Sequence, residues 1–166
     1  MTQIRIRAAT PEDRGFMFDQ APRLAAAANL PWHAERDVLV FQHRYMKAVF
    51  ARPESETAAF IAEDAAGSRI GFVYAEASTD AVTLEPCAYV TVLAVVESAQ
   101  GQGAATRLMA AAEDWARQQG FRLICLDVFA SNGRAHTFYA RQGYEEDSLR
   151  LTKPLAEPLP KPPPER

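Results

Sequence analysis

Apolar residues along the chain repeat with different periods, and each period predicts a different element. Ile4 and Ile6 alternate with arginines, as in a half-buried strand over residues 3–8. Between residues 34 and 50 the apolar positions recur every three or four residues, which predicts a helix. The predicted helix stripe consists of Val38, Phe41, Tyr45 and Val49. Residues 88–96 are apolar and largely β-branched, so they predict a central strand.

Turn and cap residues divide the rest of the chain. Thr10 is typical of a helix N-cap, with Pro11 at the first helical position and Asp13 at the third. Pro22 interrupts the helical stretch that follows and runs to residue 29. Residues 57–64 and 69–77 predict a hairpin. Further helices are predicted over 104–119 and 135–142, and further strands over 121–129 and 144–151. This order predicts an α/β fold with a mixed, mostly antiparallel sheet and helices on both faces.

Composition limits the class of protein. The chain has 166 residues, which suits one domain over residues 1–153, and residues 154–166 hold six of the eleven prolines and predict a disordered tail. The net charge of −3 and the lack of a basic run argue against nucleic-acid binding. No apolar run is long enough for a membrane span, and the polar N-terminus does not resemble a secretion signal, so we expect a cytoplasmic protein. Cys87 and Cys125 lack a CxxC spacing, so we expect reduced thiols. The three histidines form no ligand motif, so no metal is expected.

A glycine-rich loop lies between the central strand and the next helix. Residues 100–105 read Gln-Gly-Gln-Gly-Ala-Ala, in which glycines allow a ligand to approach backbone N–H groups at a helix start. This predicts a phosphate or pyrophosphate site, although an ordinary strand-to-helix turn has the same composition. A dinucleotide fingerprint needs a third glycine where Thr106 stands. Asp127 imitates its acidic residue, so a nicotinamide-dependent oxidoreductase stays a weak alternative.

A second group of polar residues follows the strand predicted over 121–129. Seven residues of helix turn through about 700°, so Asn132 and Tyr139 share one face, with His136 between them. Ala135, Phe138 and Gln142 point to the core side, so this arrangement predicts that the Tyr139 hydroxyl lies off the stripe that packs. The alternative is that Asn132 only caps the helix and that Phe138 and Tyr139 fill the core.

Together the two segments resemble the GNAT superfamily of acyl-CoA-dependent N-acyltransferases. The first motif, Q/R-x-x-G-x-G/A, is met by Gln100, Gly103 and Ala105. The second, N-x-x-A-x-x-F-Y with a following G-F/Y, is met by Asn132, Ala135, Phe138, Tyr139, Gly143 and Tyr144. Residues 6–13 also look like the first strand and helix start of that family, and the resemblance extends over residues 3–153.

The resemblance implies a GNAT-like fold and acetyl-CoA as the acyl donor. The central strand would diverge from the next strand, so that the backbone of Leu93, Ala94 and Val95 pairs with the pantetheine arm. Asn132 would contact the pantetheine or thiol end, and Tyr139 would stand beside the sulfur and protonate the leaving thiolate. The backbone that would hold the pyrophosphate comprises Gln100, Gly101, Gln102, Gly103, Ala104, Ala105 and Thr106.

The general base is not evident from the motifs. Many relatives carry a glutamate on the central strand, but residues 89–92 of this chain include no carboxylate. Glu76 is the first substitute, since alternation places it on the face of Ile70, Phe72 and Tyr74. Glu85 and His136 are weaker candidates.

The resemblance places the acceptor between the first two helices and the last strand. The candidates there are Trp32, His33, Arg36, His43 and Tyr45. The short acidic turn over residues 145–148 favours a cationic primary amine on a small molecule or peptide. We therefore predict an N-acetyltransferase that works by direct attack, and a homodimer is compatible with this function. The alternative from another class is a non-catalytic acyl-CoA-binding regulatory module.

Overall fold

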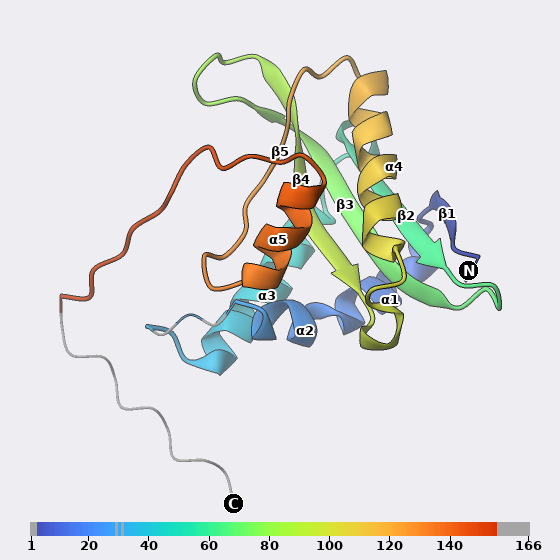
Figure 1. Cartoon of the computed structure of the whole chain (residues 1–166), viewed down its shortest axis with the longest axis horizontal. Coiled ribbons are helices and arrows are strands. Elements are labelled where there is room, and N and C mark those ends of the chain that lie inside the picture. Colours follow the sequence, from blue (N-terminus) through green and yellow to red (C-terminus); the bar gives the residue numbers. More distant parts are fainter. Residues whose placement is uncertain (1–2, 29, 31, 156–166) are drawn as a thin grey trace, which may run out of the picture.

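The computed structural model describes residues 3–28, 30 and 32–155, which form one five-stranded sheet with helices on both faces (Figure 1). The strand order follows the sequence, β1-β2-β3-β4-β5. All neighbours are antiparallel except β4 and β5, which are parallel. The strands are β1 (Arg5–Ala8), β2 (Thr57–Glu63), β3 (Arg69–Thr79), β4 (Pro86–Val95) and β5 (Ile124–Leu126). The predicted fold class is confirmed.

Helices pack on the two faces through separate apolar clusters. On one face α4 (Ala104–Gln118) buries Leu108, Met109 and Ala112 against the sheet. The opposite face is covered by three helices that bury Met17, Ala21 and Met46. These helices are α1 (Arg14–Asp19), α2 (Ala21–Ala26) and α3 (Glu35–Val49). The last helix, α5 (Gly133–Arg141), follows β5, and its aromatic residues pack against the cluster of α4.

A β-bulge in β4 changes the direction of its residues. Tyr74 of β3 pairs with Val92, but the next residue, Ala75, pairs with Val90, so Thr91 is an extra residue. The side chain of Val90 therefore lies in the cluster of α4, whereas those of Val92 and Ala94 lie in the cluster of α1–α3. A second irregularity, opposite Ala62 and Glu63, places Ile70 in the cluster of α4. The prediction that Ile70 shares a face with Phe72 and Tyr74 is therefore wrong.

Buried charge fixes the start of the first helical segment. Asp13 is fully buried, and its carboxylate accepts hydrogen bonds from Arg7 at 2.6 and 2.9 Å and from Arg69 at 2.6 Å. It also accepts the backbone N–H of Thr10 at 2.8 Å, in keeping with the predicted helix start. The side-chain hydrogen bond from Arg7 is the main reason why the pKa of Asp13 is far below its usual range.

Two predicted elements differ from the structure. Residues 144–151 form no strand, and this part of the chain leaves α5 as an extended, mostly exposed segment (Figure 1). The strand predicted over 121–129 is paired only over Ile124–Leu126, because the chain turns away from β4 after Leu126. Within the described residues, no helix has the length and apolar character needed to cross a membrane.

Candidate active site

A cleft of about 1080 Å³ opens where β4 and β5 diverge. Pairing between these strands ends at Val90 and Leu126, so the edge of β4 beyond Val90 faces the cleft instead of a neighbouring strand. Most of the predicted cofactor-binding residues line this cleft. They are Leu93, Ala94, Val95, Gln100, Gly101, Gly103, Ala104, Ala105, Thr106, Asn132 and Tyr139, while Gln102 and Glu76 are not part of its wall.

The bulge determines which backbone groups of β4 face the cleft. Ala88 N donates to Leu123 O on the β5 side, whereas Val96 N donates to Ile70 O on the β3 side. These two residues would point the same way in a regular strand, because backbone groups alternate. The extra residue therefore directs the N–H and C=O groups of Leu93 and Val95 into the cleft, and those of Ala94 toward β3.

The glycine loop forms the end of the cleft beyond Val95. Gly101 and Gly103 have φ values of +74° and +90°, which L-residues with a side chain rarely adopt. Arg107 N donates to Gly103 O, so the amides of Ala104, Ala105 and Thr106 belong to the first turn of α4, where no intrahelical acceptor exists. These amides and the positive end of the helix dipole suit a phosphate group.

Two glutamines hold the loop in place. Gln102 Nε2 donates to Ser98 O at 2.8 Å, which turns this side chain back toward the preceding turn. Gln100 Oε1 accepts a hydrogen bond from Arg134 of α5. Since Arg134 also lines the cleft, this contact brings a guanidinium group next to the loop amides.

Asn132 and His136 have structural contacts at the start of α5. Asn132 Oδ1 accepts Ala135 N at 3.1 Å, so the amide caps the helix, as the alternative interpretation predicted. Asn132 also lines the cleft. His136 Nε2 lies 3.2 Å from Phe129 O, and its Nδ1 lies 3.6 Å from Glu146. His136 is not part of the cleft wall.

Tyr139 combines both roles that the sequence left open. Its ring packs edge-on against Phe138 and Tyr144, with ring centroids 5.2 and 5.7 Å apart, and so belongs to the core. It also lines the cleft, and its hydroxyl has no hydrogen-bond partner within the described residues. Burial raises the pKa of Tyr139 to about 12, so the phenol keeps its proton at neutral pH.

Glu76 lies on the side of the sheet that faces α3. Its side chain is 10% exposed, and Oε2 lies 2.8 Å from Arg52 Nε. The two groups form an ion pair, but Oε2 accepts no hydrogen bond from the described residues. Burial raises the pKa of Glu76, and Arg52 partly opposes this effect. The assignment of Glu76 as the base stays a prediction, although the ion pair gives this carboxylate a structural partner.

The comparisons with known proteins identify the family. The profile of the acetyltransferase (GNAT) family matches residues 22–144, which span the cleft from α2 to the end of α5. This chain belongs to that family.

Members with known sequence or structure extend this result. An uncharacterized N-acetyltransferase, YhfO of Bacillus subtilis, is 32% identical over 98 residues, or 59% of this chain and 66% of that protein. An aminoalkylphosphonate N-acetyltransferase of Salmonella typhimurium is 40% identical over 38% of this chain and 41% of its own length. The chain thus matches two thirds or less of these curated relatives.

Solved structures agree on the fold. A Pyrococcus furiosus protein, provisionally described as an acetyl transferase, superposes with a TM-score of 0.77 at 22% identity over 92% of this chain and all of that one. The aminoglycoside N-acetyltransferase AAC(6')-Iy, in complex with CoA, superposes with a TM-score of 0.67 at 21% identity, over 94% of this chain and 97% of its own.

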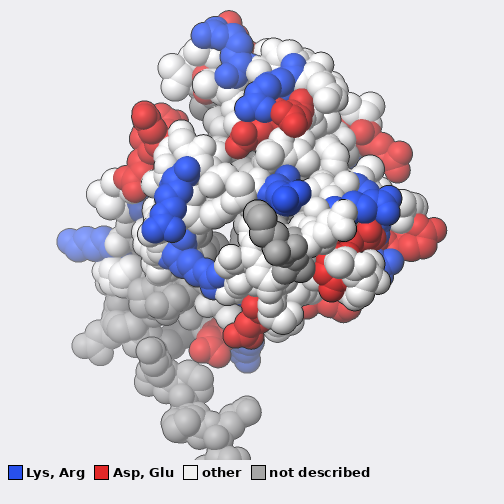
Figure 2. Space-filling view, turned by 45° about the vertical axis from the view of Figure 1, so that its right-hand side comes forward, with Lys and Arg blue, Asp and Glu red and all other residues white. Residues whose placement is uncertain are grey.

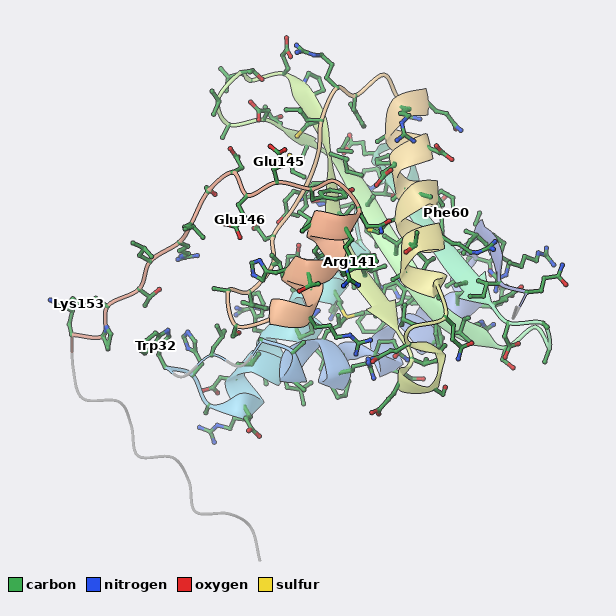
Figure 3. All side chains as sticks on the ribbon, in the orientation of Figure 1. Trp32, Phe60, Arg141, Glu145, Glu146 and Lys153 are labelled. Atoms are coloured by element: carbon green, nitrogen blue, oxygen red, sulfur yellow. The ribbon has the colours of Figure 1, made fainter. Side chains whose placement is uncertain are left out.

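Most residues that the sequence analysis named for the acceptor lie outside the cleft wall. Of the predicted acceptor residues only Tyr45 lines the cleft, beside Phe41, and the two rings stack at 5.8 Å. The buried stripe of α3 is instead Val38, Gln42, Met46 and Val49. Glu145 and Glu146 lie on the segment that leaves α5, outside the cleft wall (Figure 3). The acidic turn therefore does not supply charge to the wall.

Sequence reasoning missed most of the charged groups in the wall. The wall carries the guanidinium groups of Arg23, Arg134, Arg141 and Arg150 and the carboxylate of Asp127. Asp127 directly follows β5. The sequence did hold a signal for it, since a polar residue directly after a strand often belongs to a functional site. The described residues contain no cluster of three or more His, Cys, Asp or Glu suited to a metal ion.

Proposed function

We propose that this protein is an N-acetyltransferase that moves the acetyl group of acetyl-CoA to a primary amine. One observation carries the proposal: a single cleft joins an unpaired strand edge, a loop of free helix-start amides and a protonated phenol. The pantetheine arm would pair with Leu93 and Val95, and the pyrophosphate would rest on the amides of residues 104–106. Asn132 would contact the pantetheine, and Tyr139 would give its proton to the departing sulfur.

The charges of the wall support CoA as the donor. Four arginines and one aspartate line the cleft, and a nucleotide cofactor with several phosphate oxyanions matches this excess of positive charge. On the face shown in Figure 2, Lys and Arg side chains form short groups among uncharged and acidic residues, and not one tract along the whole face such as a nucleic-acid groove requires. We therefore infer a small-molecule or peptide acceptor.

The experiment is acetyl transfer with a panel of primary amines. The purified chain is mixed with acetyl-CoA and 2-aminoethylphosphonate, an aminoglycoside, spermidine or a lysine peptide, and release of free CoA is followed. The first two acceptors are chosen because relatives and structural neighbours are named for them. We expect at least one amine to raise CoA release well above the amine-free rate.

The non-catalytic alternative gives a different result. A regulatory module would bind acetyl-CoA, and so show a raised Tm, without transferring its acetyl group to any amine. We favour the enzyme because the phenol of Tyr139 is free within the described residues. We further propose a cytoplasmic enzyme, which suits its two free cysteines. A homodimer stays a prediction, which sedimentation would test.

A further inference from the structure

The cleft is lined from both faces of the sheet. The helices α4 and α5 contribute the loop amides and Tyr139, whereas α2 and α3, on the opposite face, contribute a second set of wall residues. In the proposed complex the pyrophosphate rests on the first turn of α4, so the donor occupies the side of α4 and α5. The side of α2 and α3 is therefore open to the acceptor.

A stacked pair of aromatic rings lines this open side. Phe41 and Tyr45 lie one helical turn apart on α3, with ring centroids 5.8 Å and ring planes 21° apart. Leu24 of α2 adds apolar surface to the same wall. Phe41 is 43% exposed, and this exposed surface belongs to the cleft, whereas the neighbouring Val40 lies outside the wall. The pair thus leaves apolar surface uncovered in a cavity, which is typical of a ligand site.

A third ring comes from the segment between β5 and α5. Phe129 lines the cleft, is 37% exposed and pairs with no other aromatic ring of the described residues. Its backbone is held firmly, because Phe129 O accepts the N–H of Asn132 at 2.8 Å and lies 3.2 Å from His136 Nε2. The ring is therefore presented to the cleft by a fixed segment.

One hydrogen bond joins the segment of Phe129 to the end of α2. Ser131 Oγ donates to Ala28 O at 2.7 Å, although the two residues lie 103 positions apart in the chain. Ser131 is two residues after Phe129, and Ala28 is four residues after Leu24. This contact ties together two walls of the open side before any ligand binds. A slot of fixed width binds a rigid, flat group with little further ordering.

We propose that the acceptor is an arylalkylamine, a primary amine on a short alkyl chain that carries an aromatic ring, and that Phe41, Tyr45 and Phe129 bind its ring. This inference rests on the proposed function and names its substrate class. The ring would stack on the pair from α3 and pack against Phe129, covering the apolar surface that these side chains leave exposed. Val92 of β4 also lines the cleft and has its side chain on this face, so the slot continues to the strand edge proposed for the pantetheine.

An acceptor with an anionic group is the competing class. Arg23 is the charged residue among those that α2 and α3 contribute to the described wall, and it would attract such a group. Apolar and aromatic residues outnumber Arg23 and Gln42 on this side, however, and a small anion would leave the three rings uncovered. We therefore favour the aromatic acceptor.

The test measures kcat/KM of the wild type for four amines with acetyl-CoA. They are 2-phenylethylamine, its saturated analogue 2-cyclohexylethylamine, n-butylamine and 2-aminoethylphosphonate. The first two have similar size, so they differ chiefly in the flat ring. We expect 2-phenylethylamine to exceed n-butylamine at least about tenfold and the saturated analogue about threefold, because aromatic stacking adds to the burial of apolar area.

Variants then assign the preference to the slot. Phe41→Ala and Phe129→Ala should each raise the KM for 2-phenylethylamine about tenfold and bring its ratio to n-butylamine toward one. Phe41→Tyr retains a ring and should retain the preference. Val40→Ala is the matched control, since Val40 is an exposed apolar residue of α3 outside the wall. Thermal unfolding checks each fold, and Phe41→Leu, which keeps much of the volume without a ring, replaces an alanine variant that does not fold.

The outcomes separate this inference from the proposed function. If the wild type acetylates no amine of this set or of the earlier panel, the proposed function is wrong. If it acetylates amines but treats 2-phenylethylamine no better than n-butylamine or the saturated analogue, the function stands and the aromatic slot is wrong. A preference for 2-aminoethylphosphonate would mean that Arg23 and not the rings selects the acceptor. A preference that survives in folded Phe41 and Phe129 variants, or that is lost equally in Val40→Ala, would also overturn the proposal.

Discussion

Replacement of Gly103 by alanine tests the glycine loop. Gly103 precedes α4 with φ +90°, and a Cβ added there would have no heavy atom within 4 Å. The cost is therefore backbone strain alone, about 1–2 kcal/mol for a left-handed residue. For a chain of this length that free energy lowers Tm by roughly 2–8 °C. Gly15→Ala is the control, because Gly15 lies within α1, has no positive φ and has equal space.

The same substitution should weaken cofactor binding. If residue 103 relaxes to a negative φ, the amides of residues 104–106 no longer converge on the pyrophosphate. We expect the Kd for acetyl-CoA to rise at least about tenfold, or roughly 1.4 kcal/mol, and the Tm increase on adding acetyl-CoA to shrink accordingly. Calorimetric titration and thermal unfolding measure both quantities. A folded Gly103→Ala protein with unchanged Kd, or a Gly15→Ala protein with an equal loss, would refute this account of the loop.

Three further predictions concern the proton donor, the buried charge and the tail. Tyr139→Phe keeps the ring in its aromatic cluster, so Tm should hold while the transfer rate falls about 10²-fold, or about 2.7 kcal/mol; an unchanged rate would mean that water protonates the thiolate. Asp13→Asn should lower the free energy of unfolding in urea by about 1.5–3 kcal/mol, the scale of hydrogen bonds to a charged group, because Arg7 keeps Glu63 as a partner and both arginines are partly exposed to solvent. The lowered pKa of Asp13 adds stability that is complete above its unfolded pKa of about 3.9 and is lost as the pH falls below that value, so the gap between wild type and variant should close in acid. A chain that ends at Lys153 should keep its Tm and its acetyl-CoA affinity, and a large drop in either would mean that the proline-rich tail packs on the domain.

Local chemistry in the sequence was enough to predict the loop and most elements. Gly101 and Gly103 have the left-handed backbone that the loop requires, and Gly120 and Gly143 follow the C-caps of α4 and α5 with the positive φ typical of glycine there. Pro22 lies in the first turn of α2, where its missing N–H costs nothing. These features depend on one or two residues each and leave a direct trace in the sequence.

Features that depend on the pairing of distant strands were not predictable. The extra residue at Thr91 is visible only from the register against β3. The sequence therefore gave no reason to expect that the backbone groups of Leu93 and Val95 face the cleft while those of Ala94 face β3. In the same way Phe41 and Tyr45 match a helical period, yet they line a cleft because β4 and β5 diverge opposite them. Residues 144–151 were predicted as a strand, but the described structure offers that segment no pairing partner.

The extra residue at Thr91 makes β4 unequally sensitive to changes in chain length. Deletion of Thr91 itself would leave Val90 and Val92 on opposite faces, as they are now, and would make the pairing with β3 regular. Deletion of Leu93 would instead exchange the two faces of the residues that follow, turning Ala94 out of its core and the backbone of Val95 toward β3. Gaps in alignments of this chain with its relatives therefore belong at Thr91 or in the exposed turn over residues 80–85, and not elsewhere in β4.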